Sequence, residues 1–276
     1  MQIGPYTVTS LVFDHFRLDG GAMFGVVPKP LWERRIPGDS QNRIQLASRV
    51  LLIEGAGRKI LVDIGCGSKY TPKQTDIYVF VPQVSPAPEV QFADVTDIIL
   101  THLHFDHCGG ITYFDHTGNA ALTFPSATIH LQQKNFERAL HPGPRERGTY
   151  FPENVEPLKS AKLNLTKDSQ EIFPGITVFQ VNGHTDGMQW VLIEHDGKAV
   201  AFAADLVPTA HHLPVPYVMG YDLCATTSMK EKEEFLSLAA QTGWYVAFCH
   251  DADTAAVRVD RDKKGTYIAA ETLVSL

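Results

Sequence analysis

Four side chains of the kinds that bind metal ions fall within six consecutive positions of the sequence. They belong to the run THLHFDHCGG, which begins at residue 101, and are His102, His104, Asp106 and His107. The run directly follows the apolar segment 97–100, which we predict to be the end of a strand. In an extended segment, side chains two positions apart point to the same side, so His102 and His104 can share one ion. The spacing therefore predicts a metal site at this strand end.

Three further residues of metal-binding type lie in the same local setting, each shortly after a predicted strand. With the strand that each follows, they are His184 (176–181), Asp205 (199–204) and His250 (244–249). In α/β proteins, loops that converge at one edge of a sheet bring such residues together. Imidazole and carboxylate ligands suit zinc better than magnesium or calcium, which prefer oxygen ligands alone. We therefore expect divalent zinc, with manganese, iron and cobalt as alternatives.

The segments that must position these residues are short, apolar and rich in β-branched side chains. Besides the strands already named, the segments 49–54, 59–63 and 191–194 fit buried strands. The clearest helix is predicted over 228–242, with Ser228 and Glu231 as a capping box at its start and Gly243 as its stop. Strands and helices mix along one chain, which indicates an α/β fold.

Length, composition and charge limit the possible domains and partners. The chain has 276 residues, 44% of them hydrophobic, and a formal net charge of −7. This length predicts a single domain over 1–276, and the acidic balance disfavours nucleic acid and anionic membranes as partners. No apolar run reaches the roughly 20 residues that cross a bilayer. With no signal-peptide pattern in residues 1–20, we expect a cytoplasmic protein, unless a leader was removed.

Four segments rich in proline, glycine or aromatic residues interrupt the predicted elements. We predict that 81–89, 140–162 and 213–218 are loops. The segment 140–162 resembles a domain boundary, but ligands on both sides of it favour a long surface loop. The segment 23–32 is apolar and broken by Gly and Pro, which disfavours a helix or a central strand. It is expected either to form an apolar wall over the metals or to serve as a core-packing or dimer-contact arm.

The cysteines and serines offer little support for a side-chain nucleophile. The four cysteines, Cys66, Cys108, Cys224 and Cys249, lie far apart without a C-x-x-C pair, so we expect reduced and mostly buried thiols. Cys249 precedes His250 and should point away from it, because adjacent strand residues face opposite ways. There is no G-x-S-x-G elbow. A metal-based mechanism is therefore favoured.

The order and spacing of the candidate ligands resemble those of the metallo-β-lactamase superfamily over nearly the whole chain. The resemblance rests on H-x-H-x-D-H at 102–107, on GHT at 183–185, on LVDIG at 61–65, and on Asp205 and His250. It implies a four-layer αββα sandwich with two metal ions at one edge of the sheets. It also implies that His102, His104 and His184 hold the first ion. Asp106, His107 and His250 would hold the second, and Asp205 would bridge the two.

Residues around these ligands are expected to orient them. Asp63 in the LVDIG segment is predicted to be a structural hydrogen-bonding residue beside the site, not a ligand. Thr101 and Thr185 are predicted to hydrogen-bond to ligating groups, because most metal-bound imidazoles need a partner for their other nitrogen.

Two such ions suggest hydrolysis. Ions about 3.5 to 4 Å apart can share a water, lower its pKa toward neutrality and present a bridging hydroxide as the nucleophile. Asp106 is expected to orient that hydroxide. In the similar acyl-homoserine lactonases, a tyrosine shortly after the bridging aspartate assists the leaving group, but Pro208 occupies that stretch here. The candidate proton donors lie further along the chain and are His211, His212, Tyr217 and Tyr221, with His212 and Tyr221 preferred.

The expected activity is hydrolysis of an ester, lactone or related bond, such as that of an organophosphate, in a mostly apolar small molecule. Similar proteins are often homodimers. A glyoxalase II-type thioester hydrolase shares the ligands, but the chain ends soon after His250 and leaves no room for that group's helical domain. A persulfide dioxygenase-like iron oxidoreductase shares the fold and usually holds one iron, so a metal count separates it. A purely structural metal site is disfavoured, because such sites are usually closed by four ligands.

Overall fold

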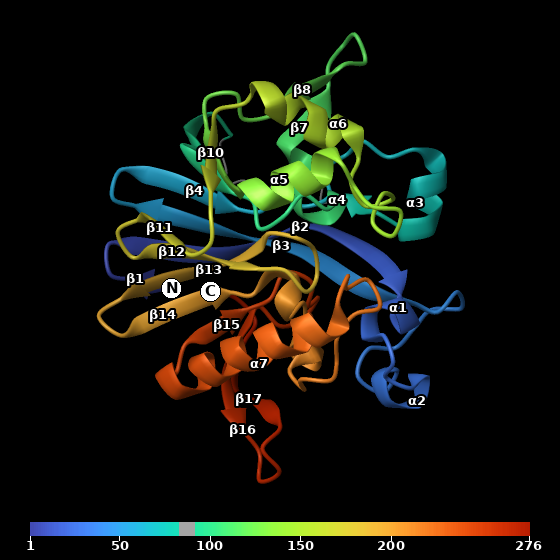
Figure 1. Ribbon diagram of the computed structural model, residues 1–276, viewed down its shortest axis with the longest axis vertical. Helices are drawn as coiled ribbons and strands as arrows, with labels where there is room; N and C mark the ends of the chain where they lie inside the picture. Colours follow the sequence, from blue (N-terminus) through green and yellow to red (C-terminus); the bar gives the residue numbers. More distant parts are fainter. Residues whose placement is uncertain (83–91) are drawn as a thin grey trace.

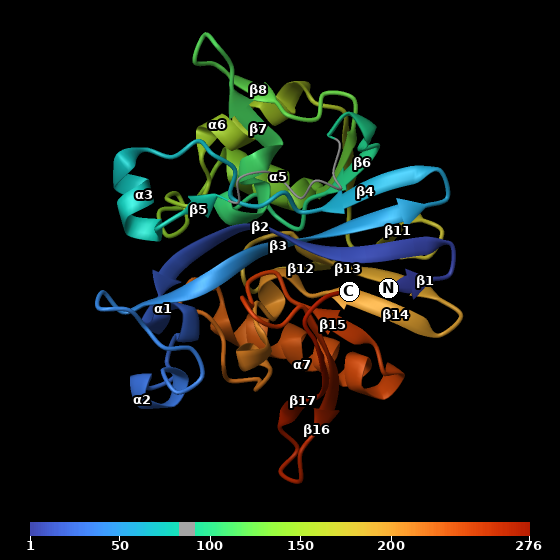
Figure 2. The ribbon, with the colours of Figure 1, turned by 180° about the vertical axis from the view of Figure 1, so that it is seen from behind.

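The computed structural model describes residues 1–82 and 92–276. Two large sheets lie face to face, with helices on their outer sides (Figures 1 and 2). The layers follow the order helix, sheet, sheet, helix, so the predicted α/β sandwich is confirmed. The helices are α1 (Gly20–Phe24), α2 (Lys29–Trp32), α3 (Pro72–Tyr78), α4 (Phe105–Cys108), α5 (Gln133–Leu140), α6 (Pro152–Val155) and α7 (Ala225–Thr242).

The first sheet has eight strands and lies under α4, α5 and α6. Its strands, in spatial order, are β1 (Gln2–Ile3), β2 (Tyr6–Asp19), β3 (Arg43–Gly55), β4 (Arg58–Val62), β6 (Asp97–Ile99), β9 (Thr128–Gln132) and β10 (Leu163–Thr166), with β5 (Val81–Pro82) beside β2. β4, β6 and β9 are parallel neighbours. Parallel strands end at the same edge of a sheet, so the residues after β4 and β6 lie side by side.

The second sheet has seven strands in sequence order and is covered by α7. They are β11 (Gln170–Phe173), β12 (Ile176–Val181), β13 (Met188–His195), β14 (Lys198–Phe202), β15 (Tyr245–Ala247), β16 (Ala256–Arg261) and β17 (Tyr267–Leu273). β13 is antiparallel to both β12 and β14, and β14 is parallel to β15. Thus β12, β14 and β15 run in one direction, and the residues that follow them meet at one edge. A small separate sheet pairs β7 (Thr112–Phe114) with β8 (Ala120–Leu122).

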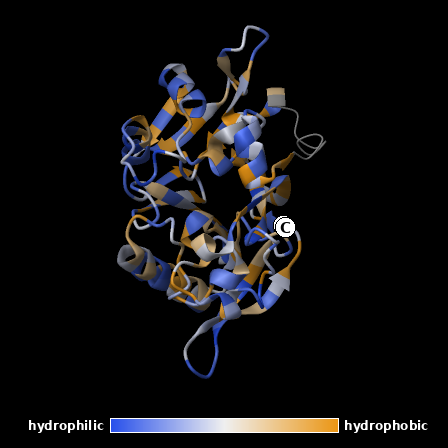
Figure 3. Ribbon diagram, turned by 90° about the vertical axis from the view of Figure 1, so that its right-hand side faces the viewer, coloured by the Kyte–Doolittle hydropathy of each residue, from blue (hydrophilic) through white to orange (hydrophobic). Residues whose placement is uncertain are grey.

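The core between the two sheets is built from β-branched, leucine and phenylalanine side chains. Val8, Leu51, Val191, Val200 and Phe202 are among its fully buried members. Figure 3 shows hydrophobic and hydrophilic residues alternating along the ribbon, with hydrophilic residues in the projecting hairpin loop at the bottom. Truncating one such side chain, as in Leu51→Ala, costs about 2 to 5 kcal/mol of stability. In the described ranges, no helix combines the length and the apolar character needed to cross a membrane.

Helix α7 ends as predicted but begins three residues earlier. Gly243 stops it in the left-handed conformation, with φ of 72°. Its N-cap residue is Cys224, so Ser228 lies inside the helix and Glu231 is no capping-box partner. Instead, the Glu231 carboxylate accepts hydrogen bonds from the backbone amides of Asn182 and Gly183, at 2.8 and 2.9 Å. The predicted capping box is wrong, because the turn before His184 recruits Glu231.

Two of the four predicted irregular segments contain helices. Within 140–162, α6 and a 3₁₀ helix (Glu156–Ser160) bury Val155 and Leu158 in a hydrophobic cluster with strand residues such as Ile98 and Ile129, so a plain surface loop is wrong there. The segment 23–32 includes the end of α1 and all of α2, so the expectation that it contains no helix is wrong; Asp19 and Pro28 are the N-cap residues of the two helices. The segment 213–218 has no helix or strand, as predicted. In 81–89, Val81–Pro82 form β5, so the predicted loop is wrong for these two residues, and the rest of the segment lies outside the described residues.

Candidate metal centre

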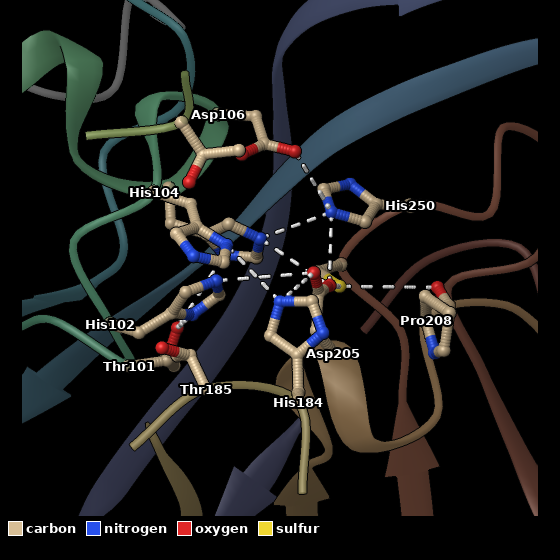
Figure 4. A network of polar contacts seen from close by, with 12 residues as sticks. Thr101, His102, His104, Asp106, His184, Thr185, Asp205, Pro208 and His250 are labelled. Carbon is tan, nitrogen blue, oxygen red and sulfur yellow. Dashed lines mark hydrogen bonds and ion pairs between the residues drawn. The ribbon is translucent and has the colours of Figure 1, made fainter. Parts of the chain in front are cut away.

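The seven predicted ligands come together where the strand ends of both sheets meet (Figure 4). None of them is more than 8% exposed. We call this set the ligand cluster, and its members are His102, His104, Asp106, His107, His184, Asp205 and His250. Four of these residues follow β6, and the other three follow β12, β14 and β15. The cluster therefore depends on the packing of one sheet against the other.

Asp205 lies at the centre of the ligand cluster. One group of ligand atoms within 4.8 Å of one another comes from His102, His104, His184 and Asp205, and a second group comes from His107, Asp205, Cys249 and His250. Asp205 belongs to both groups and uses a different oxygen for each. Its Oδ2 lies 3.2 Å from Nε2 of His184, and its Oδ1 lies 3.1 Å from Nε2 of His250. This geometry is the one required of a carboxylate that bridges two ions.

The backbone before Asp205 has an unusual conformation. Ala204 has φ of 50°, in the left-handed region that residues other than glycine rarely occupy. This conformation costs about 1 to 2 kcal/mol, and such strain is concentrated at functional sites. It occurs where the chain leaves β14 and enters the short 3₁₀ helix that presents Asp205.

The arrangement of the imidazole nitrogens suits metal binding better than hydrogen bonding between the rings. Nε2 of His102 is buried and has no hydrogen-bond partner among the described residues. Nδ1 of His104 faces Nε2 of His184 at 3.1 Å, and Nε2 of His107 faces Nε2 of His250 at 3.1 Å. Buried polar atoms normally have partners, and converging imidazole and carboxylate donors suit borderline divalent ions. The residues present therefore fit the predicted metal ions.

Two predicted orienting residues hold two of the three histidines that follow β6, His102 and His107. Asp63 Oδ2 lies 2.8 Å from Nδ1 of His107, and Asp63 also accepts hydrogen bonds from the amide and hydroxyl of Thr101. The Thr101 hydroxyl in turn lies 3.1 Å from Nδ1 of His102. A metal-binding histidine commonly has such a partner on its other nitrogen. The hydrogen-bonding roles predicted for Asp63 and Thr101 are confirmed.

Two further orienting groups could not be foreseen. Asp222 Oδ1 lies 2.9 Å from Nδ1 of His184, and the Ala47 carbonyl oxygen lies 2.9 Å from Nδ1 of His250. Asp222 is separated from His184 by 38 positions, so no local pattern marks it. Ala47 acts through its backbone and has no side-chain signal. Both contacts keep Nε2 of their histidine directed into the ligand cluster.

Thr185 does not orient a ligand, so that prediction is wrong. Its hydroxyl donates to Glu146 Oε2 at 2.8 Å and lies 2.7 Å from the hydroxyl of Tyr150. The Tyr150 ring packs edge-on against His104, with ring centroids 4.8 Å apart. The segment after α5 therefore supports the ligand cluster from outside, through buried polar and aromatic contacts.

Cys249 does not point away from His250. Its Sγ donates to Asp205 Oδ1 at 3.3 Å and lies among the second group of ligand atoms. Strand alternation does not apply, because β15 ends at Ala247. Asp106 lies outside that group, although its Oδ2 is 3.5 Å from Nε2 of His250. The second group can thus offer a metal ion the Cys249 thiol as well as the predicted Asp106 carboxylate.

The electrostatic environment couples the acids and histidines of the ligand cluster. Burial lowers the pKa of His102 and His104 well below the usual value, and neighbouring histidines add to this effect. Burial by itself would lower the pKa of His250, but Asp205 and Asp106 lie close and raise it to about 9. Burial likewise opposes ionisation of Asp205, yet the adjacent histidines lower its pKa well below 3.8. The Asp205 carboxylate is therefore held ionised.

A cavity of about 270 Å³ opens onto the ligand cluster. His104, Asp106, His184, Asp205 and His250 line its polar part, and Leu18, Met23, Tyr78, Phe105 and Met219 line its apolar part. Arg145, Gly220 and Tyr221 are its exposed lining residues, and we call these three the mouth. The segment 23–32 contributes Met23 to the wall, while Phe24 and Trp32 pack in the core. The volume lies just below the range of about 300 to 1,000 Å³ that is usual for small-molecule sites.

The two preferred proton donors have different surroundings. Tyr221 is 37% exposed and lies at the mouth. His212 is fully buried, with Nδ1 2.8 Å from the Thr209 hydroxyl and Nε2 2.9 Å from the Met23 carbonyl oxygen. It is not among the cavity-lining residues, and burial lowers its pKa to about 3. The structure does not bring His212 to the site, and we retain only Tyr221.

Comparison with known protein sequences identifies related proteins. A sequence profile of the metallo-beta-lactamase superfamily matches residues 43–250. The N-acyl homoserine lactonase AiiA of Bacillus thuringiensis subsp. kurstaki is 34% identical over 101 residues, which are 37% of this chain and 34% of the lactonase. The chain thus matches about a third of that relative's length. A probable metallo-hydrolase of Mycobacterium tuberculosis is 26% identical over 215 residues, covering 67% of this chain and 66% of that protein.

Solved structures extend the similarity to the whole chain. A probable metal-dependent hydrolase from Staphylococcus aureus has a TM-score of 0.87 and 31% identity, covering 99% of this chain and 100% of that one. AidC, described as a dizinc quorum-quenching lactonase, has a TM-score of 0.77 over 98% of this chain and 96% of its own. Its 19% identity shows a shared fold alone. Because the profile covers most of the sequence and the staphylococcal protein matches it end to end, this chain belongs to the metallo-beta-lactamase superfamily.

Proposed function

We propose that this chain is a metal-dependent hydrolase that holds two divalent ions in the ligand cluster and cleaves an ester, lactone or related bond. The observation that carries the proposal is the central position of Asp205, whose two oxygens face two separate groups of ligand atoms. Zinc is the ion we expect, because the donors are mainly imidazoles. Metal-dependent hydrolases and lactonases among the relatives support this choice of chemistry.

When bound, two such ions supply hydroxide from water near neutral pH and polarise the oxygen of a carbonyl or phosphoryl group. The residues of the chain fix where this chemistry takes place. Asp63 and Asp222 orient His107 and His184 through their outer nitrogens. Asp106 lines the cavity beside His250, where its carboxylate can accept a hydrogen bond from the attacking water. No side-chain nucleophile is needed.

The cavity lining supports a small and largely apolar substrate. Leu18, Met23, Phe105 and Met219 offer a surface for an acyl or alkyl group and limit the access of water. Tyr221 at the mouth is the proposed hydrogen-bond donor to the substrate oxygen or the leaving group. The names of the lactonase relatives favour lactones within this substrate class.

The test is metal content per chain by elemental analysis, combined with a panel of lactones, aryl esters and phosphotriesters. We expect close to two zinc ions per chain and turnover of at least one lactone or ester. Chelator-treated protein should be inactive, and returning zinc should restore the rate. Full metal loading without turnover of any panel member would contradict the proposal. One iron per chain without hydrolysis would favour the iron oxidoreductase instead.

The predicted homodimer stays a prediction. Val26 and Leu31, in the segment 23–32, are 89% and 48% exposed. Light scattering on the purified protein would measure the oligomeric state directly.

A further inference from the structure

Arg145 is a charged residue at the mouth for which the proposed hydrolysis has no use. It is the only lysine or arginine among the residues that line the cavity. It lies in the segment between α5 and α6, and it is exposed to solvent. A cation at this position faces any molecule that enters the cavity.

Two backbone carbonyls hold the Arg145 guanidinium in place. Its Nη2 donates to the carbonyl oxygen of Gly220 and, at 3.2 Å, to that of Asp222. These contacts join the segment after α5 to the loop that carries Tyr221. The guanidinium is therefore positioned across the mouth before any ligand binds, which lowers the entropic cost of binding.

Most of the hydrogen-bonding capacity of Arg145 is unused. A guanidinium has five N–H donors, and Nε and Nη1 of Arg145 have no partner in the part of the chain that the structure describes. No carboxylate within that part forms an ion pair with it either. Arg138, seven positions earlier, instead pairs with Glu146 and Asp186. Arg145 thus differs from an arginine that serves only to stabilise the fold.

An anchored cation without an acidic partner at the edge of a partly apolar cavity favours a negatively charged ligand group. The lining limits that charge, because Asp106 and Glu146 belong to the same cavity and would repel a doubly charged group. A single carboxylate fits these conditions better than a phosphate. The apolar residues Leu18, Met23 and Met219 would contact the intervening part of the ligand.

We propose that Arg145 binds a carboxylate of the substrate that is remote from the bond to be cleaved. The substrate is then an ester or lactone with an apolar middle and one acid group, and Arg145 determines the preference for that acid. This inference rests on the proposed hydrolase function for the identity of the cleaved bond. The binding of the acid group itself can be tested without any reaction.

The test uses two pairs of compounds with metal-loaded protein. One pair consists of the inert phenyl ether of a medium-chain carboxylic acid and its primary amide, neither of which contains an ester or lactone bond, and calorimetry measures the Kd of each. The other pair consists of the mono-4-nitrophenyl ester of a dicarboxylic acid and the same compound with its free acid group converted to a methyl ester. Cleavage of the 4-nitrophenyl ester is compared by kcat/KM. The variants are Arg145→Gln and Arg145→Lys. Arg147→Gln is the matched control, because Arg147 is exposed in the same segment but outside the cavity lining.

The wild type should prefer the acid of each pair by about tenfold or more, as charged hydrogen bonds allow. Arg145→Gln should remove this preference, Arg145→Lys should keep part of it, and Arg147→Gln should leave it unchanged. Because each ratio compares two compounds on one variant, a general loosening of the mouth cancels out. If Arg145→Gln does not fold, a full wild-type preference in Arg145→Lys overturns the proposal.

The two proposals can fail separately. An unchanged acid preference in Arg145→Gln overturns the assignment, and equal losses for both compounds of a pair show that Arg145 binds a neutral acceptor, which also overturns it. Arg145-dependent binding of the inert acid without hydrolysis of any ester would support this inference while contradicting the hydrolase function.

Discussion

The ligand cluster and the mouth are parts of one cavity, but they differ in burial and in how many of their side chains are fixed by hydrogen bonds. In the ligand cluster, each residue is buried, and His107, His184 and His250 all have a partner for the outer nitrogen. At the mouth, the Tyr221 hydroxyl has no hydrogen-bond partner within the described residues, and Arg145 uses only one of its nitrogens as a donor. The buried set is suited to fix one type of chemistry, whereas the mouth is free to interact with whatever enters. Substitutions in the two regions should therefore have different effects.

The largest effect is expected for Asp205→Ala. Loss of the carboxylate between the two groups of ligand atoms should lower metal content sharply and turnover by more than about 100-fold, since removing a residue that only orients a ligand already costs about 10- to 100-fold in metal affinity or activity. Elemental analysis and kcat/KM on one preparation would measure both. Asp196→Ala is the control, because Asp196 is exposed and remote from the ligand cluster. Wild-type metal content and rate in Asp205→Ala would rule out the bridging role.

A smaller effect is expected for Asp222→Ala, which removes the partner of His184 Nδ1 but no ligand. Metal affinity should fall by about 10- to 100-fold, and turnover at saturating metal should fall less. Competition with a chromophoric chelator would give the affinity. An unchanged affinity would mean that the 2.9 Å contact between Asp222 and His184 does not orient the ring.

These two residues also show what could be predicted from sequence. Asp205 follows the apolar run 199–204, and its residue type and position sufficed to include it in the ligand cluster. All seven predicted residues do meet in the structure, although their role as ligands stays a proposal. Asp222 was missed because its contact with His184 depends on the path of the loop before α7. Such long-range hydrogen bonds have no periodicity or spacing that a sequence reveals.

The errors in the fold prediction have a similar physical origin. The strand 176–181 was predicted with its observed bounds because its apolar pattern extends over the whole element. The strand before His250 ends two residues earlier than expected, at Ala247, and this reversed the predicted direction of Cys249. Ser228 and Glu231 matched a capping box, but Glu231 is used by the backbone at Asn182 and Gly183. In each case a tertiary contact overrode a local signal.

At the mouth, Tyr221→Phe should lower turnover by about five- to tenfold while leaving metal content unchanged, because a single hydrogen bond contributes about 1 kcal/mol. The loss should be greatest for alkyl leaving groups, which need a proton, and small for 4-nitrophenolate. Comparing kcat for these two kinds of ester on the wild type and the variant would measure it. If Tyr221→Phe lost metal, Tyr221 would be supporting the ligand cluster, and the proposed difference between the mouth and the ligand cluster would be wrong.

The smallest effect on activity is expected for Lys232→Met. This substitution should change the stability of the protein instead. Lys232 is fully buried, and its Nζ donates to the carbonyl oxygens of Pro214 and Tyr217, in the loop that leads to the mouth. Burial lowers its pKa to about 7 from 10.5, and Asp222 opposes this shift only in part. Between these two values the unfolded chain binds more protons than the folded chain. The stability contributed by this group therefore rises as the pH increases from 7 toward 10.

Denaturation in urea at pH 7 and pH 9 would check this expectation. The free energy of unfolding of the wild type should increase relative to that of Lys232→Met, while contributions from other groups cancel in the difference. The same pH dependence in both proteins would show that Lys232 has an ordinary pKa in the folded state.

The order of the ligands along the chain has a consequence for biosynthesis. His102, His104, Asp106 and His107 leave the ribosome almost together, but His250 emerges near the end of the 276 residues. Until the second sheet has formed and packed, no ion can contact the complete set, and metal affinity arises together with folding. If the proposed centre holds metal ions, loading is therefore a late step, and an ion bound early by the first four side chains must still fit the other three. Bound ions would then link the two sheets, so that metal content would report whether both halves of the protein have folded correctly.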